Sequence, residues 1–111
     1  MDDLSQLPFL YLTTTGWKSG RAHQIEIWFT SWNGCYYIIA EHGEKAHWVQ
    51  NIRRQPRVTF KVGAQVFSGT ARVVEAEQEA ELQQRISALS EAKYDWGDGL
   101  VVELKPEAKI E

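Results

Sequence analysis

The sequence of 111 residues has little cysteine, little proline and no long apolar run. Its single thiol, Cys35, excludes an internal disulfide and is typical of proteins of the reducing cytoplasm. The longest uninterrupted apolar run, residues 35–40, is far too short to span a bilayer. Residues 1–3 form an acidic start without a signal-peptide pattern. We therefore expect a cytoplasmic protein without a membrane segment.

Linkers, internal repeats and low-complexity segments are lacking as well. A chain of this length with 43% hydrophobic residues builds one modest core, so we assign residues 1–111 to a single domain. The net charge of −3 argues against general nucleic-acid binding. His42 and His47 have no cysteine or carboxylate at ligand spacing, so no metal site is expected.

The charge is unevenly distributed along the chain. Residues 1–61 carry seven Lys or Arg and five Asp or Glu, whereas residues 62–111 carry five and ten. Most basic side chains of the first part fall into one cluster at 18–21 and another at 53–61. If the fold brings these clusters together, they form a local anion site on an acidic protein. If it does not, they are ordinary solvated charges.

The most informative segment is residues 13–23, which read Thr-Thr-Thr-Gly-Trp-Lys-Ser-Gly-Arg-Ala-His. The β-branched threonines end a strand, the glycines make a tight turn, and an alternating strand follows. Such a turn exposes backbone N–H groups and short hydroxyls beside Lys18 and Arg21, which is a suitable cradle for a phosphate. It is not a Walker loop, because no helix pattern follows it.

Periodicity predicts a mainly β protein with two helices, an α+β class. Asn33-Gly34 is a strong signal for a two-residue hairpin. Strands joined by short turns, with two covering helices, indicate a small antiparallel barrel of about six strands. We expect strands at 9–15, 23–31, 35–41, 57–62, 65–74 and 100–104, the last ending before Pro106, and helices at 44–54 and 76–93.

Two motifs in order carry a family resemblance. The run at 13–21, followed later by Trp48-x-x-Asn51-x-x-x-x-Pro56, resembles the deazaflavin-dependent nitroreductase family. That family has the flavin-binding split β-barrel fold of pyridoxamine-phosphate oxidase. The resemblance implies a homodimeric oxidoreductase that binds coenzyme F420, with FMN as the alternative cofactor. It also implies hydride transfer from the reduced cofactor to a small organic acceptor, such as a quinone, a nitro compound or an enone.

The same resemblance implies roles for individual residues. Lys18, Ser19 and Arg21 carry over as contacts to the cofactor phosphate. Trp48 and Asn51 carry over as helix residues beside the cofactor. A non-catalytic carrier of a flavin or a tetrapyrrole is the alternative function, because it uses the same anchor and needs no proton donor.

The sequence departs from the usual family pattern at three positions. Trp17 stands where a basic residue is common, Ala22 where proline is common and His23 where arginine is common. His23 remains a candidate anion contact because of its place in the motif. The loss of cations predicts a weaker hold on a long anionic tail, which leaves F420 and FMN open as cofactors.

The aromatic residues allow two interpretations. Trp28, Trp48 and Trp96 are expected either to wall a planar cofactor ring or to fill a homodimer interface. Trp48 also suits an ordinary core position. Tyr94 is the candidate proton donor, although a tyrosine is more often only a packed aromatic. The physiological substrate does not follow from the sequence.

Overall fold

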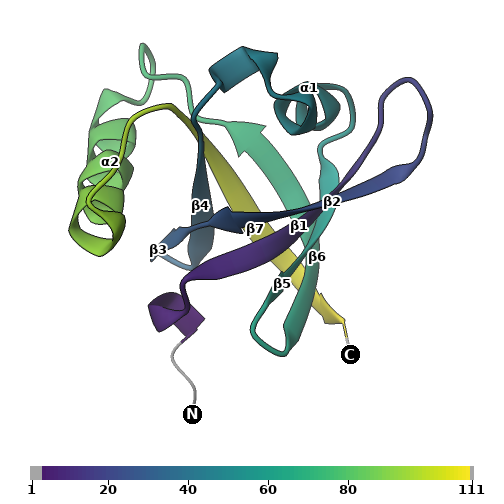
Figure 1. The fold of residues 1–111 in the computed structure, drawn as a ribbon, viewed down its shortest axis with the longest axis horizontal. Coiled ribbons are helices and arrows are strands. Elements are labelled where there is room, and N and C mark those ends of the chain that lie inside the picture. Colours follow the sequence, from purple (N-terminus) through teal and green to yellow (C-terminus); the bar gives the residue numbers. More distant parts are fainter. Residues whose placement is uncertain (1–3, 111) are drawn as a thin grey trace.

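Seven strands form one antiparallel sheet in the computed structural model, which describes residues 4–110; the acidic residues 1–3 lie outside this part. The order across the sheet is β2-β1-β5-β6-β7-β4-β3, so its outermost strands, β2 and β3, are consecutive in the sequence. The sheet therefore curls until its edges approach, giving a barrel with a seam (Figure 1). The strands are β1 (Phe9–Thr15), β2 (Ala22–Trp28), β3 (Thr30–Trp32), β4 (Cys35–Ala40), β5 (Arg57–Val62), β6 (Gln65–Val73) and β7 (Leu100–Ile110).

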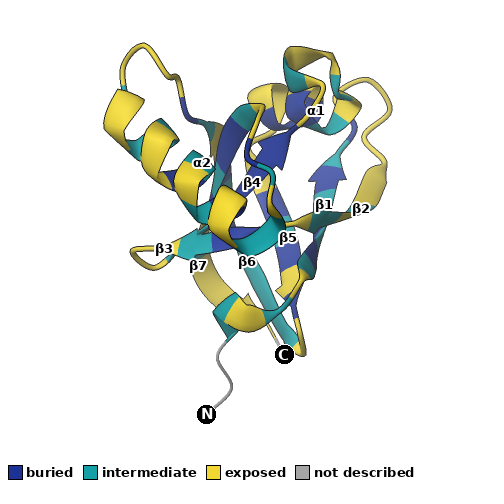
Figure 2. Ribbon diagram, turned by 60° about the vertical axis from the view of Figure 1, so that its left-hand side comes forward, coloured by how far each residue is buried: buried dark blue, intermediate teal, exposed yellow. Residues whose placement is uncertain are grey.

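Two helices cover the barrel in different places. They are α1 (His47–Arg54) and α2 (Ala80–Tyr94), and two short 3₁₀ turns lie at Leu4–Gln6 and Gly43–Lys45. Ile52 of α1 packs against the interior cluster, so α1 closes one end of the barrel (Figure 1). Ile86 of α2 is buried against the outer face of β4 and β7, and the other face of α2 is exposed (Figure 2). No helix within residues 4–110 has the length and apolar character needed to cross a membrane.

Alternating side chains fill the barrel interior. Along β1, Leu10, Leu12 and Thr14 are buried while their neighbours are half-exposed, as the two-residue period of a strand requires. The buried interior residues come from five strands, the Phe29 position and α1: Leu10, Leu12, Phe29, Ile38, Ile52, Val58, Phe60, Val62, Ala71, Val102 and Leu104. The predicted antiparallel architecture with two helices therefore follows from the sequence pattern.

The seam arises where the sequence predicted one strand over 23–31. That strand is interrupted at Phe29, whose backbone N–H donates to the Tyr94 hydroxyl at 3.1 Å. Lys93 Nζ and the Tyr94 hydroxyl donate in turn to the Phe29 carbonyl, at 2.9 and 2.8 Å. Because α2 takes the polar groups of Phe29, the chain leaves the sheet there, and no ladder joins β2 to β4 within the described residues.

Three other boundaries differ from the predicted ones, and the remaining strand ends agree within one residue. The helix expected at 44–54 is divided, because Ala46 is extended between the 3₁₀ turn and α1. The helix expected at 76–93 begins only at Ala80. The last strand continues through Pro106 to Ile110, opposite a bulge at 68–69. Proline is tolerated there because β7 has β6 as its only neighbour beyond Leu104.

Candidate functional site

The turn between β1 and β2 is closed by its own backbone. Gly16 N–H donates to the Arg21 carbonyl at 2.7 Å, and Gly20 N–H donates to the Gly16 carbonyl at 2.8 Å. Gly20 adopts a φ of +73°, a left-handed conformation that favours glycine. The backbone N–H groups of Lys18 and Ser19 have no acceptor among the described residues. The turn is exposed beside α1 (Figure 2), so these groups are available to an anion.

Gly16 makes room for the side chains that gather on this turn. A Cβ at Gly16 would lie 2.7 Å from Ser19 Oγ and 2.9 Å from His23 Nε2. Ser19 Oγ also accepts a hydrogen bond from the Arg21 N–H at 3.2 Å. The structure thus brings four of the predicted phosphate contacts, Lys18, Ser19, Arg21 and His23, to one small turn.

Asn51 ties α1 to this turn from below. Its side chain is only 6% exposed, and its Oδ1 accepts from the Trp17 N–H at 3.3 Å. Its Nδ2 donates to Thr14 Oγ1 at 3.1 Å. A buried amide must find such partners, and here both lie on the β1 side of the turn. Asn51 therefore positions the turn backbone.

One residue of the second basic cluster reaches the turn. The Arg54 guanidinium lies 4.6 Å from the centroid of the Trp17 ring, and Lys18 Nζ lies 4.9 Å from the same ring. The expectation that the two clusters meet therefore holds for Arg54. The sequence signal was its spacing from Asn51, since residues three apart on a helix are neighbours.

The other arginines of that cluster are neutralised within the chain. Arg53 pairs with Glu44 and with Glu75, the latter at 3.0 Å. Arg57 pairs with Glu107 at 2.7 Å. These two side chains therefore behave as the solvated, paired charges of the alternative interpretation.

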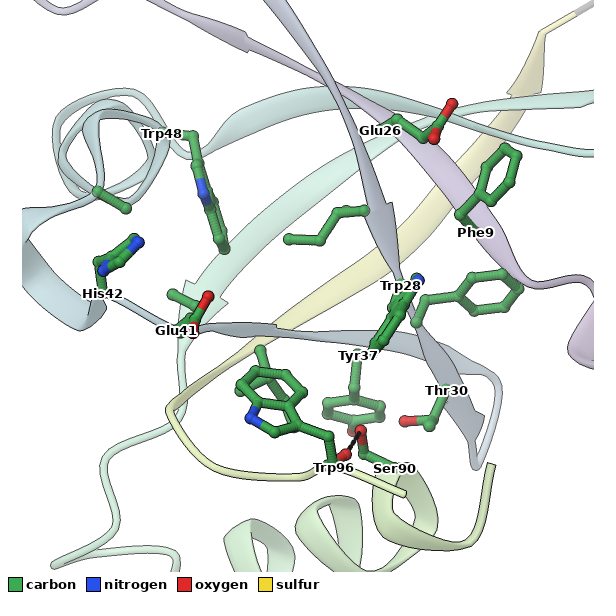
Figure 3. Close-up of a pocket in the computed structure, with 15 residues that line it drawn as sticks. Phe9, Glu26, Trp28, Thr30, Tyr37, Glu41, His42, Trp48, Ser90 and Trp96 are labelled. Atoms are coloured by element: carbon green, nitrogen blue, oxygen red, sulfur yellow. Dashed lines mark hydrogen bonds between the residues drawn. The ribbon is translucent and has the colours of Figure 1, made fainter. Parts of the chain in front are cut away.

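A groove of about 590 Å³ lies along the seam (Figure 3). Figure 3 shows Trp48 of α1 on one side of it, Trp28 of β2 on the other and Trp96 of the loop after α2 below. Its lining residues are Phe9, Glu26, Ile27, Trp28, Phe29, Thr30, Tyr37, Ile39, Ala40, Glu41, His42, Ala46, Trp48, Ser90 and Trp96. All three tryptophans expected to wall a planar ring thus border one cavity.

The aromatic wall of the groove is held by ring contacts. Trp28 is 48% exposed, and its ring stacks on Tyr94 with centroids 4.5 Å apart and planes 3° from parallel. The Trp96 ring meets the Trp28 ring edge-on at 6.2 Å. Trp48 is half-buried and also packs against the barrel core. A flat wall of this kind suits a planar ring system.

The charged lining of the groove is acidic. Glu26 and Glu41 lie at its rim with His42, and no Lys or Arg is among its lining residues. Glu26 is exposed, and its hydrogen bond raises the pKa of the Tyr11 phenol beside it. The groove and the basic turn therefore differ in charge.

The two tyrosine hydroxyls nearest the groove are engaged elsewhere. The Tyr94 hydroxyl is within hydrogen-bond distance of the Pro8 and Phe29 carbonyls, and Tyr94 does not line the groove. Burial raises the pKa of Tyr94. The Tyr37 ring lines the groove, but its hydroxyl donates to Glu103 at 2.7 Å. Burial, and then this carboxylate, raises the pKa of Tyr37. The geometry lends no support to Tyr94 as a proton donor.

Helix α1 connects the groove to the turn. Trp48 faces the groove, Asn51 lies under the turn and Arg54 stands beside Trp17. Six residues of α-helix separate the first from the last, a rise of about 9 Å. A ligand with a planar ring and an anionic side chain fits these two neighbouring regions.

Comparisons with known proteins indicate one family and one fold. The model of the F420H(2)-dependent quinone reductase family matches residues 2–99. A solved F420-H2 dependent reductase is 26% identical over 88% of this chain and 94% of its own, with a TM-score of 0.63. A structure described as a domain-swapped dimer is 27% identical over 87% and 78%, with the same TM-score of 0.63.

A putative pyridoxamine 5'-phosphate oxidase from Listeria innocua has a TM-score of 0.77 over 96% of this chain and 90% of its own, at 19% identity. This likeness confirms the split-barrel fold. A search of curated proteins gives no match. Since the family model covers nearly the whole described chain, the protein belongs to this family of quinone reductases: it is an oxidoreductase, and coenzyme F420 is the cofactor indicated.

Proposed function

We propose that the protein reduces a small neutral quinone with reduced coenzyme F420. The observation that carries this proposal is the path along α1, which joins an aromatic groove at Trp48 to a basic turn at Arg54. One ligand with a flat ring and an anionic side chain is recognised by both regions at once.

The turn is proposed to hold the cofactor phosphate. Lys18 and Arg21 supply charge, and the N–H groups of Lys18 and Ser19 point to no acceptor among the described residues. Hydrogen bonds from charged donors to phosphate are about twice as strong as neutral ones. His23 lies against Ser19 over Gly16 and completes the cradle. Asn51 positions this backbone through its bond to Trp17.

The groove is proposed to hold the ring. Trp28, Trp48 and Trp96 orient a planar group between them and exclude water from its faces. The bound deazaflavin supplies the hydride, so the protein need only place the acceptor against it. The hydroxyls of Tyr37 and Ser90 donate within the chain, to Glu103 and to the Trp96 carbonyl. We therefore assign the proton on the reduced acceptor to water at the groove mouth.

The acceptor class follows from the charge of the groove. Two carboxylates, Glu26 and Glu41, stand at the rim without a lysine or arginine among the lining residues. An anionic acceptor is repelled there, and a neutral planar one is not. A quinone meets both conditions and agrees with the family. Nitro compounds and enones are the remaining neutral candidates.

The active form is proposed to be a homodimer. Trp28 lines the open groove and is 48% exposed. Tryptophan is enriched at protein interfaces, and a second copy laid over the groove would shield the ring from water. A 27% identical structure described as a domain-swapped dimer supports this. Sedimentation of a stable monomer at micromolar concentration would contradict it.

The function is tested by following oxidation of reduced coenzyme F420 with 1,4-naphthoquinone as acceptor. We expect turnover with the neutral quinone and slower turnover with a sulfonated naphthoquinone. Lys18→Ala should weaken cofactor binding by about ten- to a hundred-fold, since a charged hydrogen bond contributes roughly 1.5–3 kcal/mol. Lys61→Ala, in β5 opposite Tyr11 of β1, is the matched control. Failure of the wild-type protein to bind the coenzyme would refute the proposal.

A further inference from the structure

We infer that Trp17 is a positioning residue that holds Arg54 beside Lys18, and that Arg54 binds a second anionic group of the cofactor, beyond the phosphate that Lys18 anchors. The inference rests on the proposed role of the turn as the phosphate anchor. It adds a carboxylate-bearing tail to the ligand that the site selects.

The geometry places two cations on one ring. Arg54 Cζ and Lys18 Nζ lie 4.6 and 4.9 Å from the Trp17 centroid, within the range of a cation–π contact. The Trp17 backbone is itself fixed by Asn51, since its N–H donates to the buried Oδ1. The ring is 39% exposed, so both cations remain open to a ligand. Trp17 thus joins charges that come from the turn and from α1.

Two adjacent arginines of α1 differ in whether they form an ion pair. Arg53 is occupied by Glu44 and Glu75. Arg54, next along the helix, forms no ion pair within residues 4–110, and neither does Lys18 or Arg21. Three like charges near one turn repel each other, although the whole protein has a net charge of −3. A ligand with more than one negative group relieves that repulsion.

The position of Arg54 indicates which negative group it takes. The unpaired N–H groups belong to Lys18 and Ser19, on the turn itself, and they suit the phosphate. Arg54 extends from the end of α1 to the Trp17 ring. A planar guanidinium binds a carboxylate through two parallel bonds, which makes arginine the better partner for a glutamate tail.

This arrangement revises the expectation drawn from the sequence. Trp17 stands where a basic residue is common, and we expected a weaker hold on a long anionic tail. The structure shows that the tryptophan places an arginine from another element at the same turn. The charge is therefore supplied from α1, and the preference shifts toward the cofactor with several carboxylates.

The experiment compares coenzyme F420 that carries several glutamates with FMN, which has one phosphate. Each is titrated into the wild-type protein and into Trp17→Ala at three salt concentrations. We expect Trp17→Ala to weaken F420 binding about ten-fold and FMN binding less than about two-fold, and to flatten the salt dependence for F420, since a complex with fewer charged contacts has less electrostatic attraction for salt to screen. Trp17→Phe keeps a ring and should retain most of the affinity.

The chain offers two matched controls. Trp32 is also 39% exposed and has Arg85 4.7 Å from its ring, so Trp32→Ala removes an equivalent contact elsewhere. Arg53→Ala removes a paired charge next to Arg54. Both controls should bind F420 as the wild type does, whereas Arg54→Ala should match Trp17→Ala.

Unchanged F420 affinity in both Trp17→Ala and Arg54→Ala overturns the inference, and so does an equal loss for F420 and FMN. Lys18→Ala separates this failure from that of the proposed function. If Lys18→Ala weakens both cofactors while Trp17→Ala weakens neither, only the inference fails. If Lys18→Ala binds both cofactors normally, the phosphate anchor itself is wrong. Should Trp17→Ala fail to fold, Trp17→Phe and Arg54→Ala give the same comparison.

Discussion

Two clusters of charge, one near each helix, differ in how their members are paired. On the α2 side, Arg72 donates to Glu79 and Glu103, and Glu103 also accepts from Tyr37. On the α1 side, Arg54 and Lys18 share an aromatic ring and form no ion pair within the described residues. The paired charges of Arg72 stabilise the fold, whereas the open charges of Arg54 and Lys18 are the ones that we propose for the binding site.

Each helix also holds the sheet through polar side chains. Asn51 of α1 fixes the turn through Trp17, and Tyr94 of α2 fixes the break at Phe29. The first contact shapes the basic turn, and the second shapes the aromatic groove. The two regions of the site therefore depend on residues distant in sequence from the segments that form them.

Asn51→Ala should give the largest loss of stability. It leaves the Trp17 N–H and the Thr14 hydroxyl without their partner, and an unsatisfied buried group costs about 1–3 kcal/mol. We expect the free energy of unfolding, measured with urea, to fall by about 2 kcal/mol, and cofactor binding to weaken. Gln50→Ala, an exposed neighbour on the same helix, is the control. Wild-type stability in Asn51→Ala would show that the turn does not need α1.

Tyr94→Phe should have the next largest effect. We expect the free energy of unfolding to fall by about 1–2 kcal/mol, because the Phe29 N–H loses its acceptor. The ring stack with Trp28 survives the change. Stability and turnover should be read together: if the hydroxyl only holds the seam, the pH profile of kcat keeps its wild-type shape. A collapse of kcat with unchanged stability would restore Tyr94 as a proton donor.

Alkaline pH should lower the free energy of unfolding through Tyr37, which lies on the α2 side. Burial, and then Glu103, raises the pKa of Tyr37 above its ordinary 10.0, so the folded state keeps a proton that the unfolded chain releases. The stabilisation is complete below pH 10.0 and falls as the pH rises above that value. Each such proton changes the unfolding free energy by at most about 1.4 kcal/mol per pH unit. Tyr37→Phe should flatten this decline in urea titrations at several pH values.

Arg72→Ala should have the smallest effect, about 1 kcal/mol, because its side chain is 47% exposed and surface pairs are screened, although Glu103, at 14% exposure, loses one partner. Cofactor affinity should not change. Arg54→Ala should give the reverse result, with normal stability and weaker binding. If both variants change stability alone, the distinction between the two helices is lost.

Much of the fold followed from local patterns. The β-branched threonines of β1, the alternation after the Gly turn and the Asn33-Gly34 turn predicted strands and a hairpin correctly, because those signals depend on neighbouring residues. The break at Phe29 could not be predicted, since its cause is Tyr94, which lies 65 positions away. The prediction that the last strand ends before Pro106 was wrong for the same reason. Whether a strand tolerates proline depends on which strands flank it.

The candidate site shows the same division. The motif placed Ser19 and His23 together beside Gly16, and short-range spacing was enough for that. The sequence did not show which of the arginines forms an ion pair with a carboxylate. Arg53 and Arg54 are identical neighbours, and only the positions of Glu44 and Glu75 tell them apart.

The open seam gives the barrel one compliant side. β2 is paired with β1 alone, so it can tilt away from β4 without breaking a strand-to-strand hydrogen bond. Every other wall of the barrel is stiffened by ladders on both sides of its strands, except at the short β3. A planar molecule entering at the seam therefore displaces side chains and leaves the sheet intact. In hydrogen exchange, this predicts early opening at β2 while β5 and β6 stay protected.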